Sequence, residues 1–315
     1  MSEFITIGEP ISLFGSNDLD ENLESAKNFT KYLAGAEVNV TVGVSRLGHK
    51  TEYLTRLGND PFGKFIINEL NNNHIGTKFI DETDKYWTAF QLKNQVSVGD
   101  PDIFYFRKGS AAAHFNKEKL DEVDFSKTKL VHLSGIFPAI SQNALETFEY
   151  LIDLIERNDI ISTFDPNLRP QLWDSENQMK ERINKLAQRA DIIMPGIDEG
   201  KILVGSEDPE IICDFYLNNS KKTNTVILKL GPEGAYIKTK NDNIGKHIKG
   251  YTVENVVDTV GAGDGFAVGV ITGILENLKI EEAVNRGNAI GALAIQFLGD
   301  NDGYPDREAL EKFMN

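Results

Sequence analysis

The chain has 315 residues, 40% of them hydrophobic, which is enough to bury a sizeable core. Its formal net charge of -15 at pH 7 argues against nucleic acid or an anionic membrane as a partner. Because the single Cys213 cannot form an internal disulfide and the N-terminus lacks a secretory pattern, we expect a cytoplasmic protein.

Short β-rich runs alternate with helical patterns along the chain. The sequence predicts buried strands at residues 4–7, 129–134, 160–164, 191–194 and 225–230. Apolar residues at helical spacing predict helices over residues 144–158, 179–190 and 280–298. This alternation indicates an α/β fold in which helices cover both faces of a mainly parallel sheet.

Residues 87–108 depart from this pattern, because two extended runs flank Gly99-Asp100-Pro101 with no helix between them. We interpret the segment as a β-hairpin, to which residues 11–16 can add a strand. The hairpin is either a plain edge of the sheet or a lid over a site at the carboxyl ends of the parallel strands. The pattern alone leaves both interpretations open.

The run DTVGAGDGFAVG, residues 258–269, places Gly-Ala-Gly directly before an acid. Gly261, Ala262 and Gly263 allow close backbone approach, and helical spacing after Asp264 predicts that the turn opens a helix, where anions bind. Asp264 can then take a proton from a hydroxyl while the backbone amides stabilise a phosphoryl group. The alternative is an ordinary helix cap. Glycines at 265, 269 and 273 predict a helix face that packs closely on a neighbour.

Two signatures carry a family resemblance. Residues 258–271 resemble the second signature of the ribokinase-like, or PfkB, carbohydrate kinases. Residues 34–63 resemble the first signature, with Asn39, Gly48, Gly58, Asp60 and Gly63 in register. The resemblance covers essentially the whole chain. It implies one three-layer α/β/α domain over residues 1–315 with a small β-sheet lid formed by roughly residues 10–35 and 86–110.

The same resemblance implies ATP as phosphoryl donor, a sugar hydroxyl as acceptor, Mg²⁺, in some members a monovalent cation, and a homo-oligomer formed through the lid. It assigns the general base to Asp264 and the anion hole to the backbone of Gly261, Ala262 and Gly263. The matching nucleotide-binding positions are Asn167, Arg169, Lys229, Gly231, Gly234, Gly261, Gly263 and Asn288.

Four segments, at residues 34–40, 103–112, 131–136 and 165–173, resemble the 2-keto-3-deoxygluconate kinase branch of the family. This likeness implies substrate contacts from Gly35, Ala36, Glu37, Val38, Asn39, Gln91, Tyr105, Phe106, Arg107, Arg169, Asp264 and Asp300. Two arginines in that set favour an acidic sugar, because a guanidinium binds a carboxylate through two parallel hydrogen bonds.

One position departs from the family pattern. Many members carry Asn-x-x-Glu before the nucleotide half, whereas here Gly196 precedes Glu199 in the segment MPGIDEG. The metal ligands are therefore left unknown, since Mg²⁺ is often held mainly by water and phosphate oxygens.

Two alternatives stay open. The first is a kinase for a neutral sugar, such as a fructokinase. The second is a sugar-binding protein without catalysis, which the intact Gly261–Asp264 turn disfavours. A dinucleotide-binding dehydrogenase is excluded, because only Gly-Glu-Pro follows the first predicted strand.

Overall fold

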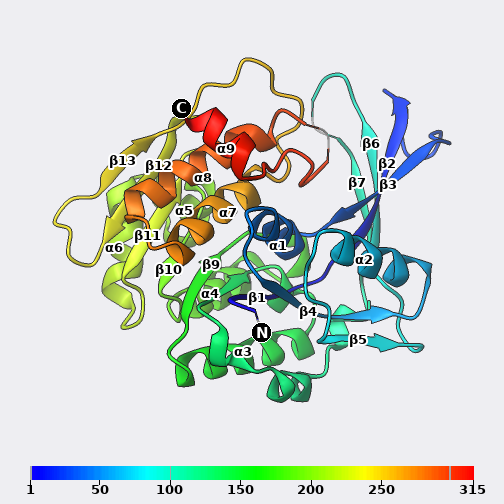
Figure 1. The fold of residues 1–315 in the computed structure, drawn as a ribbon, viewed down its shortest axis with the longest axis horizontal. Coiled ribbons are helices and arrows are strands. Elements are labelled where there is room, and N and C mark those ends of the chain that lie inside the picture. Colours follow the sequence, from blue (N-terminus) through cyan, green and yellow to red (C-terminus); the bar gives the residue numbers. More distant parts are fainter. Residues whose placement is uncertain (1, 100, 298) are drawn as a thin grey trace.

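The centre of the protein, a computed structural model that describes residues 2–99, 101–297 and 299–315, is a nine-stranded sheet (Figure 1). The pairs from β11 to β5 are parallel, and β12 and β13 join antiparallel at one edge. In sheet order the strands are β13 (Lys246–Lys249), β12 (Gly234–Thr239), β11 (Thr225–Lys229), β10 (Ile192–Ile193), β9 (Ile161–Asp165), β8 (Leu130–Ser134), β1 (Phe4–Ile7), β4 (Thr51–Gly58) and β5 (Ile80–Thr83).

Helices cover both faces of this sheet. One apolar cluster joins the sheet to α3 (Gln142–Arg157), α4 (Glu176–Ala187), α5 (Ile197–Val204) and α6 (Pro209–Asn219). A second cluster joins the opposite face to α1 (Ala36–Arg46), α7 (Ala262–Leu275), α8 (Ile280–Ala294) and α9 (Arg307–Met314), while α2 (Pro61–Asn72) packs beside β4. Neighbouring residues in a strand serve opposite faces, as Phe4 and Ile5 do. The predicted three-layer α/β/α fold is confirmed.

The five predicted buried strands correspond to β1, β8, β9, β10 and β11, and the three predicted helices correspond to α3, α4 and α8. The third helix ends at Ala294, earlier than predicted, and the predicted last residue, Leu298, lies outside the described residues. Within the described ranges, no helix has the length and apolarity needed to cross a membrane.

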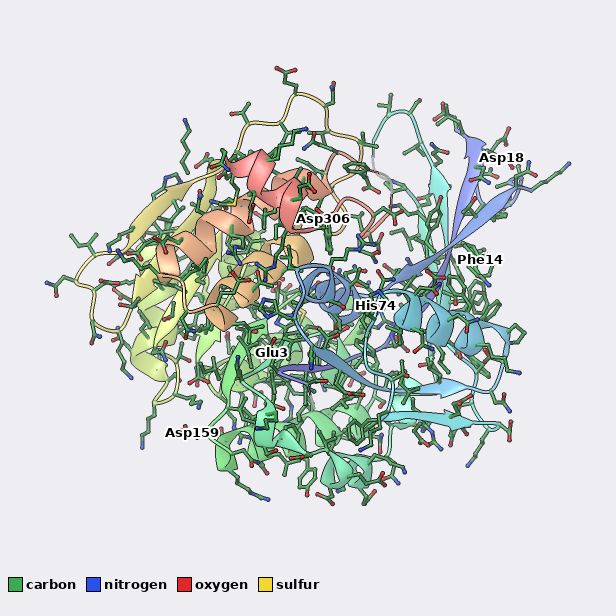
Figure 2. The ribbon with its side chains drawn as sticks, viewed as in Figure 1. Glu3, Phe14, Asp18, His74, Asp159 and Asp306 are labelled. Atoms are coloured by element: carbon green, nitrogen blue, oxygen red, sulfur yellow. The ribbon has the colours of Figure 1, made fainter. Side chains whose placement is uncertain are left out.

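A separate four-stranded sheet, which we call the lid, has the order β3-β2-β6-β7. It contains β2 (Ile11–Leu19), β3 (Phe29–Ala34), β6 (Phe90–Gln95) and β7 (Ile103–Phe106). The predicted hairpin is β6 and β7, its Asp100 lying outside the described residues, and β2 pairs in parallel with β6. Phe14 of β2, labelled in Figure 2, lies 5.5 Å from the Phe62 ring of α2 and so joins the lid to the body.

The glycine-rich face of α7 packs against α8, as predicted. A Cβ at Gly269 would lie 2.4 Å from the Gly287 nitrogen, and one at Gly273 would lie 2.4 Å from the Ala283 Cβ. Side chains larger than hydrogen would therefore push the two helices apart. This close contact fixes the direction of α7, whose first turn faces the site described below.

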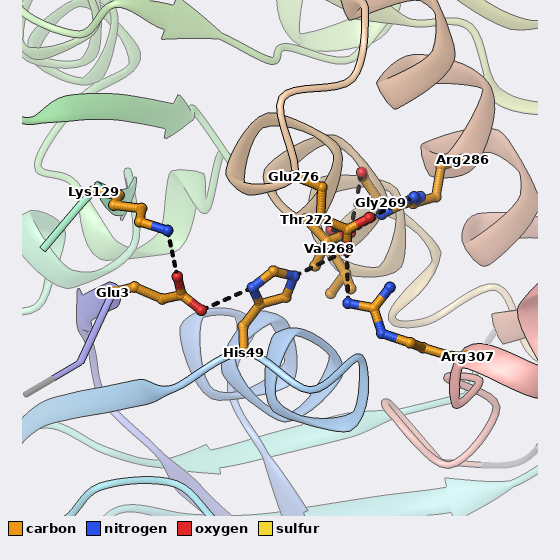
Figure 3. A network of polar contacts seen from close by, with 9 residues as sticks. All are labelled: Glu3, His49, Lys129, Val268, Gly269, Thr272, Glu276, Arg286 and Arg307. Carbon is orange, nitrogen blue, oxygen red and sulfur yellow. Dashed lines mark hydrogen bonds and ion pairs between the residues drawn. The ribbon is translucent and has the colours of Figure 1, made fainter.

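The other end of α7 is held by a polar network around Glu276 (Figure 3). His49 lies with one ring nitrogen 3.0 Å from Glu3 and the other 3.0 Å from Glu276, and Arg286 and Arg307 also reach Glu276. Burial raises the pKa of Glu276, but hydrogen bonds from Arg286, Arg307 and His49 outweigh it and lower the pKa to about 2. The network ties the C-terminus of α7 to the beginning of the sheet.

Candidate active site

A cavity of about 390 Å³ lies between the lid and the carboxyl ends of the parallel strands. From the body it is lined by Glu9 after β1, Asp165 at the end of β9 and Lys229 at the end of β11. From the lid it is lined by Ile11, Gln91, Lys93, Ile103 and Tyr105, and by Arg107 directly after β7, which we count with the lid. Open α/β sheets bind ligands at this edge. The hairpin is therefore a lid over the cavity and not a plain edge of the sheet.

Asp264 lies in this cavity and is held by two side-chain amides. Its Oδ2 accepts a hydrogen bond from Asn39 Nδ2 at 2.9 Å, and its Oδ1 accepts one from Asn167 Nδ2 at 3.5 Å. Asn301 Nδ2 donates to Asn39 Oδ1 at 2.9 Å, so the Asn39 amide can present only its nitrogen to Asp264. Because α1 begins just after Gly35, Asn39 sits in its first turn, beside the start of α7.

The first turn of α7 is open to an anion, apart from the Ala262 nitrogen, which donates to the Thr259 carbonyl at 3.4 Å. Among the described side chains none caps it, and the first amides of a helix have no intrahelical acceptor. Gly261 has a φ of 83°, and a Cβ there would lie 1.9 Å from the Asp300 carbonyl oxygen. Tyr304 donates to the Gly261 carbonyl at 2.7 Å. Glycine is thus required at position 261 by both conformation and space.

A lysine from a distant strand stands beside this turn. Lys229 Nζ lies 2.6 Å from Asp165 Oδ2, and a Cβ at Gly263 would be 3.7 Å from the same Nζ. Burial lowers the pKa of Lys229, but the neighbouring carboxylates Asp165, Glu199 and Asp264 outweigh it and raise the pKa. The Gly261–Asp264 turn has no cation of its own, and the fold brings one to it from β11.

Asp264 has an unusual pKa for a carboxyl group. Burial raises it most, the Asn39 hydrogen bond opposes this, and the charge of Asp165 raises it further, to about 7. A carboxylate that binds protons near neutral pH is suited to take a proton from a hydroxyl.

This pKa predicts how turnover depends on pH. If Asp264 is the general base that the sequence predicts, only its ionised carboxylate can accept the proton, so kcat/KM should rise with pH and reach half its plateau near pH 7, at the pKa of Asp264 of about 7. A pH profile of kcat/KM measures this midpoint. A midpoint at the ordinary aspartate value, about pH 4, would contradict the assignment of Asp264 as the base.

Arg107 does not face the cavity as a free cation. Its Nη2 lies 2.6 Å and its Nε 2.7 Å from Glu9 Oε2, and Ser110 Oγ donates to Glu9 Oε1. Glu9 is 2% exposed, so this ion pair is shielded from water. Arg169 donates to the Leu168 carbonyl at 2.8 Å, and no carboxylate among the described residues pairs with it.

Among the described residues, unpaired polar atoms lie at Glu37, which lines the cavity, and at Tyr53, which is fully buried and is not part of the lining. Glu37 Oε1 accepts from Ser134 Oγ at 2.6 Å, whereas Glu37 Oε2 and the Tyr53 hydroxyl are buried without a hydrogen-bond partner in the described part of the chain. Burial raises the pKa of Glu37. Buried polar atoms without partners are rare and mark a place for a ligand group or a water.

The cavity brings together most of the sequence-predicted residues. Its lining includes Gly35, Ala36, Glu37, Asn39, Gln91, Tyr105, Arg107, Asn167, Arg169, Lys229, Gly261, Gly263, Asp264 and Asp300. Six predicted residues are not in this lining: Val38, Phe106, Gly231, Gly234, Ala262 and Asn288.

Most of these absences have a physical reason. Val38 is fully buried in the apolar cluster beside β4. Phe106 alternates with Tyr105 along β7, so its ring stacks on Phe90 at 4.4 Å on the other face of the lid. Asn288 donates its amide to the backbone carbonyls of Ile248 and Lys249.

The two glycines of the 229–234 turn allow its backbone conformation. Gly234 has a φ of 101°, and a Cβ there would lie 2.2 Å from the Ile248 carbonyl oxygen, so glycine lets β12 pair closely with β13. Gly231 has a φ of 59°, and no atom of the described residues lies within 4 Å of its ideal Cβ. Ala262 is simply the first residue of α7.

The carboxylates near the turn are already engaged. Glu199 accepts from the Gly196 nitrogen at 2.7 Å and from the Leu168 nitrogen at 2.8 Å, and Asp165 pairs with Lys229. Within the described residues, no group of three or more His, Cys, Asp or Glu side chains could hold a metal ion. These carboxylates fit a magnesium ion that keeps its waters and binds mainly to phosphate oxygens.

Comparison with known proteins agrees with the two signatures. The model of the pfkB family of carbohydrate kinases matches residues 3–307. The chain belongs to the PfkB carbohydrate kinase family. A 2-dehydro-3-deoxygluconokinase from Bacillus subtilis (strain 168) is 43% identical over 313 residues, which cover 99% of this chain and 95% of that protein.

Solved structures of PfkB proteins share the fold. A PfkB protein from Polaromonas sp. JS666 superposes with a TM-score of 0.89 at 38% identity, covering 99% of each chain. An uncharacterized sugar kinase from Pyrococcus horikoshii in complex with ATP gives 0.80 at 26% identity, covering 98% of this chain and 97% of that one. The predicted family is confirmed, and as a PfkB kinase the protein is a phosphotransferase.

Three charged lining residues of this PfkB site were not singled out from the sequence: Glu9, Lys93 and Asp165. Two of them had a usable signal. Glu9 and Asp165 follow or end the strands at 4–7 and 161–165, and acids at the carboxyl ends of parallel strands gather at one edge. Lys93 lies in the middle of a lid strand, and no local pattern marks it.

Proposed function

We propose that the protein transfers a phosphoryl group from ATP to the terminal hydroxyl of 2-keto-3-deoxygluconate. The observation that carries the reaction is Asp264, a half-buried carboxylate oriented by Asn39 and Asn167 at the uncapped start of α7. The B. subtilis 2-dehydro-3-deoxygluconokinase, at 43% identity, supports the choice of sugar.

In this proposal the sugar lies under the lid with its terminal hydroxyl against Asp264. Asp264 takes the hydroxyl proton as the oxygen attacks the γ-phosphorus of ATP and the bond to the leaving ADP oxygen breaks. The amides of Gly261, Ala262 and Gly263, together with Lys229, offset the charge on the phosphoryl group in transit. The lid excludes water, which limits wasteful hydrolysis of ATP.

The nucleotide occupies the side of the cavity near β11 and Lys229. The ATP complex of the Pyrococcus horikoshii sugar kinase supports ATP as the donor. Mg²⁺, when bound, supplies positive charge that neutralises the phosphates. Asp165 and Glu199, fixed by Lys229 and by backbone amides, are the residues that would receive the waters of such an ion.

The carboxylate of the sugar lies at the end of the cavity away from Asp264, beside Arg107. Burial and ion pairing fix the Arg107 guanidinium through Glu9, and its remaining N–H groups stay available for a carboxylate. Arg169 also lines the cavity, its charge lowers the pKa of Asp264, which burial raises, and it carries no carboxylate partner within the described residues. In the proposal it contacts the sugar and the phosphate in turn.

Removing both charges of the Glu9–Arg107 pair tests this placement. Arg107→Met alone would strand a buried carboxylate, so it is combined with Glu9→Gln. We expect the KM for 2-keto-3-deoxygluconate to rise about 10- to 100-fold, the worth of hydrogen bonds to a charged group. The KM for 3-deoxyfructose, which has a hydroxymethyl group in place of the carboxylate, should change little. Equal effects on both sugars would place the carboxylate elsewhere.

The proposed function itself is tested by the product. Purified protein is incubated with ATP, Mg²⁺ and 2-keto-3-deoxygluconate, and the phosphate ester is located by phosphorus–proton NMR. We expect one ADP for each ester, formed at the terminal carbon. If fructose is phosphorylated and the sugar acid is not, the protein is instead a neutral-sugar kinase of the same family.

The lid also supports the prediction of a homo-oligomer. On its face away from the cavity Phe104 is 59% and Phe106 39% exposed, and their rings lie 5.0 Å apart. Grouped aromatic side chains on a surface are typical of protein contacts.

A further inference from the structure

An ion pair joins the lid to the loop that leads into α7. Lys93 Nζ, on β6, lies 2.6 Å from Asp258 Oδ2, although the two residues are 165 positions apart in the sequence. The Lys93 side chain is 12% exposed and that of Asp258 is 11% exposed. Water and salt screen a shielded ion pair much less than a surface pair. Breaking the Lys93–Asp258 pair should therefore cost more free energy than breaking a surface pair.

Asp258 also shapes the turn that forms the anion hole. Its Oδ1 accepts from the Val260 nitrogen at 3.0 Å, directly before Gly261, and its own nitrogen donates to the Ile295 carbonyl. One carboxylate oxygen therefore holds the lid while the other holds the chain entering the Gly261 turn. Both oxygens belong to one carboxylate, so a single side chain contacts the lid and the chain that enters the turn.

The acidic groups near the turn give a second reason for a cation at position 93. Asp258 and Asp300 are carboxyl groups beside a turn that must receive phosphates, and one oxygen of Asp300 is buried without a partner in the described residues. Burial raises the pKa of Asp300 most, Lys93 lowers it and Asp258 raises it, with a result of about 6. The other lid cation in the cavity, Arg107, is paired with Glu9. Lys93 is thus the lid cation beside the turn, and its charge is paired with Asp258.

We propose that Lys93 is a positioning residue that couples the lid to the anion hole. When the lid covers the sugar, the Lys93–Asp258 pair fixes Asp258, which in turn holds Val260 and Gly261 so that the amides of residues 261–263 face the phosphoryl group. The proposal rests on the proposed phosphoryl transfer at Asp264. It assigns Lys93 a role in turnover and no role in recognising the sugar.

The test compares Lys93→Met with Lys93→Arg. Lys31→Met, on β3 of the same sheet, is the matched control, since the Lys31 ammonium lies over the Phe65 ring, 4.0 Å from its centre, and lacks a carboxylate partner in the described chain. For each variant, kcat, the KM for 2-keto-3-deoxygluconate and the ratio of ADP to sugar phosphate are measured. Thermal unfolding shows whether each variant is folded.

Displacement of a catalytic turn predicts that Lys93→Met lowers kcat about 10- to 100-fold, changes the KM for the sugar by less than about threefold, and raises the ratio of ADP to sugar phosphate. Lys93→Arg, which can keep the ion pair, should recover most of kcat, and Lys31→Met should match the unchanged protein. If Lys93→Met does not fold, Lys93→Gln takes its place.

An unchanged kcat in the folded Lys93→Met variant would overturn the proposal. So would a Lys93→Arg variant as slow as Lys93→Met, because then the charge is not what matters. If the unchanged protein makes no sugar phosphate in this assay, the proposed function fails instead, which separates the two outcomes.

Discussion

Asp264→Asn should lower kcat by about 10²- to 10⁴-fold, the usual contribution of a general base. The substituted amide retains an oxygen that can accept the hydrogen bond from Asn39, but it cannot take a proton from the sugar hydroxyl. Affinity for ATP should be largely kept, because the backbone amides of residues 261–263 and Lys229 are unchanged. Steady-state rates and calorimetric ATP titration measure the two effects. Near-normal turnover would rule out Asp264 as the base.

Stability supplies the control for this variant. Folding raises the pKa of Asp264 to about 7, above the value of about 3.9 for an unfolded chain. Its ionisation therefore disfavours the folded state, and the cost develops as the pH rises from about 3.9 through about 7. Above this window Asp264→Asn should melt at a higher temperature than the unchanged protein. A slower but more stable variant separates loss of the base from loss of the fold.

Gly261→Ala should have the second large effect. A Cβ at this position would lie 1.9 Å from the Asp300 carbonyl oxygen, so the turn or the Asp300 segment must move. Movement of the turn removes amides from the phosphoryl group, and loss of one such donor typically costs about 10²- to 10³-fold in kcat. Turnover by the purified variant, with its melting temperature, measures the effect.

Gly205→Ala is a matched control for backbone strain. Gly205 has the same φ of 83° as Gly261, but it ends α5, and no atom of the described residues lies within 4 Å of its ideal Cβ. Both variants carry the strain of a left-handed alanine, about 1 kcal/mol or somewhat more. Only Gly261→Ala carries the clash. If both lower kcat equally, contact with Asp300 is not the reason for glycine in the turn.

The sequence predicts the fold well because its signals are local and repeated. Strands such as β8 and β11 are short apolar runs, and α3 shows apolar residues at helical spacing. The lid hairpin is marked by the change from this alternation to two extended runs. The early end of α8 was not predicted, because apolar residues continue through Ile295 and Phe297 beyond its last turn.

Site residues that stand together in one sequence motif could be predicted. Site residues that come together only in the folded protein could not. The turn at residues 261–264 could be predicted because its glycines and aspartate are adjacent in the sequence. The ion-pair partners of the predicted cations could not be predicted from the sequence. Glu9 and Arg107 are 98 positions apart in the chain, and Asp165 and Lys229 are 64 positions apart. Alternation along β7 sends Tyr105 and Phe106 to opposite faces of the lid, which a contiguous motif does not reveal.

The most direct test of the account compares 2-keto-3-deoxygluconate with 3-deoxyfructose under identical conditions with ATP. The two sugars differ only in carboxylate against hydroxymethyl at the end far from the reacting hydroxyl. If Arg107 recognises the carboxylate, kcat/KM for the acid should exceed that for the neutral sugar by about 10²-fold or more, since a charge-assisted contact would be lost. Equal values of kcat/KM, or a preference for 3-deoxyfructose, would contradict the proposal that this PfkB kinase acts on a sugar acid.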